Sequence, residues 1–348
     1  MVAGQETVQP LFYQCRVEDF KLLLEEKIMK ITVAEIDSVG NDIEYDVLDK
    51  LGDVTFYKDK ITEENVVDRA GEAEVLVINK SKITSDILLK MPNVRLICEF
   101  ATGFDNVDLA ACSSRNVKVA NVVGYSTASV AQHTFALYLY LSESLRHYDE
   151  FVKSGEYGAQ EHFSCLDLPF DELDGMKWGI VGMGNIGKRT AKIAEAFGAH
   201  VIFYASSGKS SCTEYEQVSF DELLAQSDVI SLHCPLSDRT KNLMDMSAFK
   251  KMKKTAYLIN VARGPVVNEE DLYEALESGE IKGAGLDVLS AEPISKDNPL
   301  GKLKDSNKII ITPHMAWGST KARTTCVNEV AENIKAYEKG LQRNIVNG

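Results

Sequence analysis

From residue 29 onward, short apolar runs alternate with segments of helical spacing, and this alternation constrains the fold more than any other feature. Alternation of this kind, with β-branched residues in the apolar runs, indicates parallel sheets covered by helices on both faces. The sequence therefore predicts an α/β protein with two doubly wound parallel-sheet domains. Strands are expected at 30–36, 53–57, 74–79, 94–100 and 117–121, and in a second series at 177–181, 200–204, 228–233, 255–260, 283–288 and 308–311.

The segment 126–146 is predicted as one long helix, because its middle is apolar around almost the whole circumference. Such a helix is buried on several sides, as it would be between domains or between subunits. A last helix is expected at about 320–339. Residues 1–28 show no consistent apolar period, and we expect an N-terminal extension to which no function is assigned.

Charge and cysteine usage exclude several classes of function. A formal net charge of -14 disfavours nucleic acid and anionic membrane surfaces, which require clustered Lys and Arg. An anionic substrate must then be bound by a local positive group. The seven cysteines are scattered and form no C-x-x-C pair, and the N-terminus has no signal-peptide pattern. We therefore expect a reducing, cytoplasmic location and no bound metal ion.

The most specific motif is the G-x-G-x-x-G run Gly182-Met183-Gly184-Asn185-Ile186-Gly187. It lies between the predicted strand 177–181 and a helical segment at 186–197, in a β-α-β context. There the first glycine permits the tight turn, the second lets the backbone approach a pyrophosphate, and the third lets the helix pack on the strand. The pyrophosphate would lie at the helix N-terminus, where N–H groups and the helix dipole favour anions. The motif predicts a dinucleotide cofactor.

The second strand of such a unit normally ends in Asp or Glu, which binds the adenosine ribose hydroxyls. Here strand 200–204 is followed by Ala205-Ser206-Ser207-Gly208-Lys209, which contains no carboxylate. The small hydroxyl residues leave room for a 2′-phosphate, and Lys209 offers it a positive charge. This favours NADP(H). A solvated loop that accepts NAD(H) without the carboxylate is the alternative.

Two segments that follow predicted strands contain groups suited to a carboxylate, and ligands of open parallel sheets bind beyond the carboxyl ends of the strands. Ala101-Thr102-Gly103 follows strand 94–100 and could direct successive N–H groups at an anion. Arg263 follows strand 255–260, and its guanidinium suits bidentate recognition of a carboxylate. An ordinary β-α turn and a surface arginine are the alternatives.

His314 follows strand 308–311, and Glu292 lies beyond the preceding strand, 283–288. Oxidation of an alcohol by hydride transfer also requires removal of the hydroxyl proton, and histidine is well suited to that near neutral pH. A carboxylate partner would orient the imidazole and stabilise its charged form. Spacing by itself does not establish a catalytic histidine.

Taken together, these segments resemble the D-isomer-specific 2-hydroxyacid dehydrogenase family. The resemblance extends from about residue 29 to about residue 340, and the matching runs follow the family order: 181–187, 259–264, 285–288, 291–293 and 312–314. It implies hydride transfer between NAD(P)H and a small 2-keto or 2-hydroxy acid. Arg263 would bind the substrate carboxylate and polarise its carbonyl, His314 would be the acid/base, and Glu292 its partner.

The resemblance also implies a domain organisation and further contacts. A Rossmann cofactor domain, 126–315, would be inserted in a flavodoxin-like substrate-binding domain formed by 29–125 and 316–348. Family members are commonly homodimers, with the long helix near the interface. Substrate contacts would come from Ala101, Thr102 and Gly103 besides Arg263 and His314. Asp287 would hold the nicotinamide carboxamide, and the further cofactor contacts would be Thr127, Cys234, Pro235 and Ala262.

Within the family, three runs (125–127, 129–135 and 168–173) most resemble glycerate dehydrogenases, also called hydroxypyruvate reductases, although Gln132 stands where many members carry Glu. The expected substrate pair is hydroxypyruvate and D-glycerate, or glyoxylate. D-Lactate and phosphoglycerate dehydrogenases are alternatives, and the lack of a regulatory domain after residue 348 weakens the second. A non-enzymatic alternative is an NAD(H)-sensing, corepressor-like binding protein, since such proteins keep the Arg–Glu–His set.

Overall fold

The computed structural model describes residues 28–303, 305 and 307–348, which form two compact units. One unit is continuous, Val123–Cys326. The other combines the described residues up to Val122 with Val327–Gly348. The extension expected at residues 1–28 lies outside the described residues, apart from Ile28. None of the described helices combines the length and the apolar character needed to cross a bilayer.

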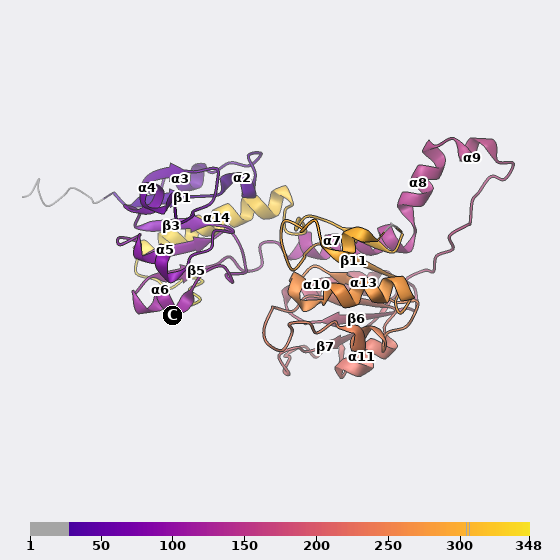
Figure 1. Ribbon diagram of the computed structural model, residues 1–348. Helices are drawn as coiled ribbons and strands as arrows, with labels where there is room; N and C mark the ends of the chain where they lie inside the picture. The colour runs from indigo at the N-terminus through magenta and orange to yellow at the C-terminus, as the bar shows by residue number, and fades with distance from the viewer. Residues whose placement is uncertain (1–27, 304, 306) are drawn as a thin grey trace, which may run out of the picture. The chain divides into compact units, whose positions relative to one another are not determined.

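The discontinuous unit contains a five-stranded parallel sheet in the order β2-β1-β3-β4-β5, of which β1, β3 and β5 are labelled in Figure 1. This 2-1-3-4-5 order is that of flavodoxin-like folds. The strands are β1 (Lys30–Val33), β2 (Asp53–Phe56), β3 (Val75–Ile78), β4 (Leu96–Glu99) and β5 (Lys118–Ala120). The helices are α2 (Ile36–Val39), α3 (Asp46–Asp49), α4 (Val66–Ala70), α5 (Ser85–Leu89), α6 (Leu109–Ser114) and the C-terminal part of α14 (Thr320–Glu338).

Every residue of β3 and β4, two of the three inner strands, is buried, which explains their nearly continuous apolar sequences. The edge strand β5 is joined to the C-terminal segment of the chain. The N–H of Val346 donates to the carbonyl of Val119 at 2.9 Å, and the Val119 N–H donates to Asn347 Oδ1 at 2.8 Å. Asn333 Nδ2 on α14 donates to the Asn121 carbonyl at 2.9 Å. These bonds hold the two separate chain segments together in one unit.

The continuous unit contains a seven-stranded parallel sheet in the order β12-β11-β10-β9-β6-β7-β8. Counted from β6, this is the 3-2-1-4-5-6 order of a Rossmann sheet, extended by β12. The strands are β6 (Lys177–Val181), β7 (His200–Tyr204), β8 (Glu216–Gln217), β9 (Val229–Leu232), β10 (Tyr257–Asn260), β11 (Gly283–Leu286) and β12 (Ile309–Ile311). The expected fold class is therefore confirmed: the chain contains a Rossmann-type sheet and a flavodoxin-like sheet.

Helices cover both faces of the seven-stranded sheet. On one face, α7 (Thr127–Ser142) and α10 (Asn185–Ala196) pack with the sheet around Trp178, whose indole lies 4.6 Å from the Phe135 ring between centroids. The opposite face is covered by α11 (Phe220–Gln226), α12 (Met246–Phe249) and α13 (Glu269–Ser278). Short elements complete the unit: α8 (Leu145–Lys153), α9 (Glu156–Ala159), and the 3₁₀ turns η1 (Gly264–Val266) and η2 (Pro299–Lys302).

Two expectations about this unit were wrong in detail. The helix expected over 126–146 ends at Ser142, and α8 begins at Leu145 after Ser144 adopts a left-handed φ of 50°. A single left-handed residue does not change the apolar pattern of the sequence, so the pattern could not predict this break. The expected six strands are seven, because β8 has only two residues, both exposed. Such a short edge strand has no apolar alternation by which it could be found.

The discontinuous unit contains a buried carboxyl group, that of Glu99 at the end of β4. Its Oε1 accepts from Asn106 Nδ2 at 3.0 Å, while Oε2 has no partner among the described residues. Burial raises the pKa of Glu99 well above its ordinary value, although the Asn106 hydrogen bond opposes the rise. The folded unit therefore keeps Glu99 protonated at pH values where the unfolded chain ionises it.

This shift gives folding stability a defined pH dependence. A carboxyl group with a raised folded pKa contributes fully below its unfolded pKa of about 4.3, and stability falls as pH rises towards the folded pKa, by up to about 1.4 kcal/mol per pH unit. Glu99→Gln should remove this contribution. The free energy of unfolding of the variant minus that of the wild type should therefore increase as the pH rises above the unfolded pKa. Urea unfolding followed by circular dichroism measures it. The exposed Glu44→Gln is the control; equal slopes for Glu99→Gln and wild type would contradict the assignment.

Candidate active site

Three predicted site residues lie in loops at the carboxyl edge of the seven-stranded sheet. Arg263 follows β10, Glu292 follows β11 and His314 follows β12. These strands are consecutive neighbours in the sheet, and all are parallel. Their loops therefore emerge side by side at one edge, which is where ligands of open parallel sheets bind.

His314 and Glu292 form a hydrogen-bonded pair. The imidazole Nδ1 lies 2.6 Å from Glu292 Oε2, and Glu292 Oε1 accepts from the backbone N–H of Leu289 at 3.0 Å. Both carboxylate oxygens of Glu292 are thus engaged, which fixes the direction in which it meets the ring. A carboxylate at Nδ1 accepts the proton there, so Nε2 is the nitrogen that can exchange a proton with a substrate.

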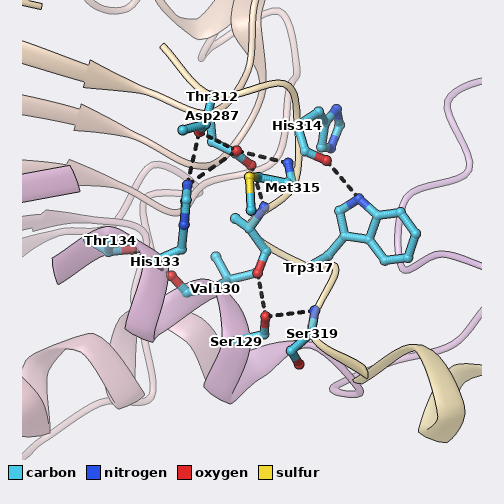
Figure 2. A network of polar contacts seen from close by, with 11 residues as sticks. Ser129, Val130, His133, Thr134, Asp287, Thr312, His314, Met315, Trp317 and Ser319 are labelled. Atoms are coloured by element: carbon cyan, nitrogen blue, oxygen red, sulfur yellow. Dashed lines mark hydrogen bonds and ion pairs between the residues drawn. The ribbon is translucent and has the colours of Figure 1, made fainter. Parts of the chain in front are cut away.

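The backbone of His314 is held in an uncommon conformation. Its φ is 51°, in the left-handed region that costs non-glycine residues free energy. The His314 N–H donates to the Asp287 carbonyl at 2.8 Å, and the His314 carbonyl accepts from Trp317 Nε1 at 2.9 Å (Figure 2). These hydrogen bonds hold the backbone of His314 at both its N–H and its carbonyl, and the fixed backbone restricts where the imidazole can lie.

The Asp287 carboxylate organises the same loop from inside the unit, where its side chain is almost fully buried. Its Oδ1 accepts from Thr312 Oγ1 at 2.6 Å and from the Met315 N–H at 2.9 Å, and Oδ2 accepts from the Ala316 N–H at 2.8 Å. Burial by itself raises the pKa of Asp287, but hydrogen bonds from His133, Thr312 and the two backbone N–H groups together leave it below its usual value. Asp287 is therefore a charged anchor for residues 312–316.

Helix α7 supplies a further contact to this loop that sequence reasoning missed. His133 Nε2 lies 2.9 Å from Thr312 Oγ1 and 3.4 Å from Asp287 Oδ1, and Ser129 Oγ donates to the Ala316 carbonyl at 2.6 Å (Figure 2). Ser129 and His133 are four residues apart and so share one face of the helix. Helix α7 contains several other polar residues, so this spacing by itself does not single out the pair.

A second histidine, His233, also follows a strand of this sheet, β9. Its Nε2 lies 3.0 Å from Ser231 Oγ, and burial lowers its pKa to about 3. His233 therefore stays neutral at physiological pH and cannot serve as the proton-exchanging group. His314 is the histidine at this edge that is suited to acid/base chemistry.

Arg263 is half-buried and begins the turn η1. Its Nη1 donates to the Ala262 carbonyl at 2.8 Å, while Asn260 Nδ2 donates to the Arg263 carbonyl at 3.0 Å. A Cβ at Gly264 would overlap the backbone of Leu289 and Ser290, so only glycine allows these two loops to pack so closely. This packing brings the loop of Arg263 against the loop that leads to Glu292.

The three glycines of the G-x-G-x-x-G run have the geometry that a dinucleotide requires. Gly182 has a φ of 95°, and a Cβ there would lie 2.9 Å from the Cys234 backbone nitrogen. A Cβ at Gly187 would overlap the Gly182 carbonyl oxygen. At Gly184 the Cβ position is open, with nothing within 4 Å, directly at the start of α10. Open space at an uncapped helix N-terminus suits a pyrophosphate.

The other predicted cofactor residues differ in exposure. Ala205 is buried, whereas Ser207 and Lys209 are exposed and Ser206 is partly exposed. Among the remaining positions, Cys234 and Ala262 are buried, Thr127 is partly exposed and Pro235 is exposed.

The predicted substrate loop, Ala101-Thr102-Gly103, lies in the discontinuous unit, at the carboxyl end of β4. The Thr102 hydroxyl donates to the Val122 carbonyl at 2.7 Å, and the Thr102 carbonyl accepts from Asn121 Nδ2 at 2.7 Å. The hydroxyl thus fixes the loop, and backbone groups remain the candidates for anion binding. Across the described parts of the chain, no group of three His, Cys, Asp or Glu side chains is arranged to hold a metal ion.

Comparison with known proteins identifies the family of this chain. The model of the D-isomer-specific 2-hydroxyacid dehydrogenase NAD-binding domain matches residues 135–316. A hydroxypyruvate reductase of Blautia hydrogenotrophica is 38% identical over 88% of this chain and 95% of its own length, and a glycerate dehydrogenase of Methylorubrum extorquens is 36% identical over 83% and 90%. The structure of an Aquifex aeolicus D-lactate dehydrogenase with NAD and lactic acid has a TM-score of 0.80 at 30% identity, covering 91% of this chain and 99% of that one.

The matched segments include the cofactor glycines and the loops of Arg263, Glu292 and His314, so the resemblance noted in the sequence is confirmed. The chain belongs to the D-isomer-specific 2-hydroxyacid dehydrogenase family, whose members are nicotinamide-dependent oxidoreductases acting on CH–OH groups.

Proposed function

We propose that this enzyme reduces hydroxypyruvate to D-glycerate, with glyoxylate as a second substrate. The observation that carries the proposal is the His314–Glu292 pair, formed by two loops at the same sheet edge as the Arg263 loop. The names of the relatives from Blautia hydrogenotrophica and Methylorubrum extorquens support this choice. D-Lactate is the second candidate, because a solved structure of similar fold contains lactic acid.

Arg263 and His314 act on different groups of the substrate. The planar guanidinium of Arg263 binds the substrate carboxylate through paired N–H donors and polarises the neighbouring carbonyl. His314 Nε2 gives a proton to the keto oxygen as that oxygen gains negative charge during reduction. Glu292 keeps the imidazole oriented through Nδ1 while this proton moves. In the oxidative direction the same nitrogen takes the hydroxyl proton.

A bound nicotinamide dinucleotide supplies the hydride for this reduction. Its pyrophosphate would be held at the N-terminus of α10 by residues Gly184 to Gly187, where the structure leaves open space. The two lone pairs of Asp287 Oδ2 receive one described hydrogen bond, from Ala316, so this oxygen keeps capacity for the carboxamide. We infer a preference for NADPH over NADH from the loop Ala205–Lys209, which contains no carboxylate.

The remaining predicted contacts fit the same assignment. Thr127, Cys234, Pro235 and Ala262 would line the cofactor, and the backbone at Ala101 to Gly103 would bind the substrate carboxylate. In this proposal the unit Val123–Cys326 binds the cofactor and carries Arg263 and His314, and the unit with the five-stranded sheet contributes the backbone at Ala101 to Gly103. The scattered cysteines favour a reducing compartment such as the cytoplasm.

We further propose that the enzyme is a homodimer. Helices α8 and α9 contain no buried residue, and they project away from the seven-stranded sheet of their own unit (Figure 1). Exposed apolar side chains of this kind indicate a protein interface, and an isologous contact with a second copy would cover them. Static light scattering should give the mass of two chains. The exposed apolar residues of α8, α9 and the chain that follows them are Leu145, Val152, Tyr157, Phe163, Leu166 and Phe170.

The substrate assignment is tested by steady-state kinetics. Hydroxypyruvate, glyoxylate and pyruvate are each assayed with NADPH and with NADH. We expect kcat/KM for hydroxypyruvate to exceed that for pyruvate by at least about tenfold, because a site that hydrogen-bonds the extra hydroxyl discriminates against its absence. A higher value for pyruvate would favour the D-lactate alternative. If the enzyme turns over none of the three keto acids, the proposal is refuted.

Arg263→Lys keeps the positive charge but loses the planar pair of donors. We expect KM for hydroxypyruvate to rise and kcat to fall, because a point charge cannot align the carboxylate and the carbonyl together. Steady-state kinetics checks this, with the exposed Arg146→Lys as the matched control. Wild-type kinetics in Arg263→Lys would show that this residue is not the bidentate anchor.

His314→Ala should lower kcat with hydroxypyruvate by about 100-fold or more, the usual contribution of a positioned acid/base. The affinity for the reduced cofactor, measured by fluorescence titration, should stay close to the wild-type value, since the proposed proton transfer occurs on the substrate. The exposed His162→Ala serves as the control and should retain full turnover. If His314→Ala turns over near the wild-type rate at every pH, another group transfers the proton.

A further inference from the structure

Arg239 lies against the loop that follows β7, although it is 30 residues away from Lys209 in the sequence. Its Nη1 donates to the Ser207 carbonyl at 3.2 Å. A Cβ at Gly208 would lie 3.6 Å from the same nitrogen, so the guanidinium also borders this glycine. Arg239 thus contacts Ser207 and borders Gly208 in the Ala205–Lys209 loop, where a Rossmann fold places the adenosine ribose.

The turn that presents Arg239 is well supported. The side chain of Thr240 is buried, and its Oγ1 donates to the Pro235 carbonyl at 2.7 Å and accepts from the Ser237 N–H at 2.8 Å. The N–H of Lys241 donates to the Ser237 carbonyl at 2.8 Å. Arg239 therefore extends from an anchored turn in the loop that follows β9, so its position relative to the sheet is defined.

The opposing loop is a tight turn without a carboxylate. The Gly208 N–H donates to the Ala205 carbonyl at 2.8 Å and closes a turn, in which Gly208 has a φ of 80°. This turn directs the Ser207 carbonyl to Arg239 and contains no carboxylate that would repel a phosphate. Asp238 precedes Arg239, but it makes no ion pair with it within the described residues.

The guanidinium has unused hydrogen-bonding capacity. An arginine carries five N–H donors, and the bond to Ser207 is the one that Arg239 makes to a described residue. Arginine binds phosphate in a bidentate manner, whereas Lys209 offers only a point charge on an exposed side chain. Of the two cations at this loop, Arg239 has the better geometry for a phosphate.

We propose that Arg239 binds the 2′-phosphate of NADP(H) and determines the preference of this enzyme for that cofactor. The inference rests on the proposed NADPH preference and assigns it to a residue outside the loop that follows β7. Ser207 and Gly208 position the guanidinium, and the phosphate completes its hydrogen bonds. Lys209, within the loop itself, adds an exposed positive charge.

The experiment measures binding of two adenosine nucleotides by calorimetry, without a reaction. Adenosine 2′,5′-bisphosphate carries the 2′-phosphate, and adenosine 5′-monophosphate lacks it. We expect the wild type to bind the bisphosphate at least about tenfold more tightly, in keeping with charge-assisted hydrogen bonds. Arg239→Ala should abolish most of this ratio without changing the affinity for the monophosphate, which also reports that the site is folded. Arg239→Lys should give an intermediate ratio.

Lys241→Ala is the matched control, because it removes one exposed positive charge from the same turn. It should keep the wild-type ratio, which separates a direct contact from a general change in charge. If the wild type shows no preference for the bisphosphate, the NADPH preference itself is wrong. If Arg239→Ala keeps the wild-type affinity ratio, or lowers the affinity for both nucleotides equally, Arg239 does not bind the 2′-phosphate. The NADPH preference of the enzyme is then due to other residues.

Discussion

The arrangement of the site depends on the buried carboxylate of Asp287. A charge removed from water costs several kcal/mol unless hydrogen bonds replace its solvation. Here the donors come from the loop that carries His314 and from helix α7: Thr312, the N–H groups of Met315 and Ala316, and His133 nearby. The hydrogen bonds that replace the solvation of Asp287 come from the segment that it positions. The same bonds therefore stabilise the buried charge and hold the loop that orients His314.

The sequence was sufficient for features that depend on local patterns or on the rule that parallel strands end at one edge. The two sheets, the roles of the three glycines, and the positions of Arg263, Glu292 and His314 beyond neighbouring strands all follow from such patterns. His133 could not be found in this way, because its partner Thr312 lies 179 residues away. The break at Ser144 and the contact of Arg239 with Ser207 also depend on single backbone angles or on loops brought together by the fold.

An acidic chain that acts on anions needs its positive groups concentrated. The net charge of -14 repels both a keto acid and a dinucleotide at long range. In the proposed function, the attraction at the Rossmann sheet comes from its carboxyl edge, where Arg263, the N-terminus of α10 and Arg239 lie in separate loops. Recognition therefore rests on short contacts with defined geometry, for which arginine and backbone N–H groups are better suited than a diffuse field.

The bonds between β5 and the C-terminal segment have a consequence for biosynthesis. They join residues more than 200 positions apart, such as Val119 with Asn347 and Asn121 with Asn333. A ribosome releases the whole segment Val123–Cys326 before the last partners of β5 exist. The Rossmann unit, being continuous, can fold as it emerges, whereas the flavodoxin-like unit must wait with an incomplete edge strand. The flavodoxin-like unit is thus the first to begin translation and the last to complete its fold.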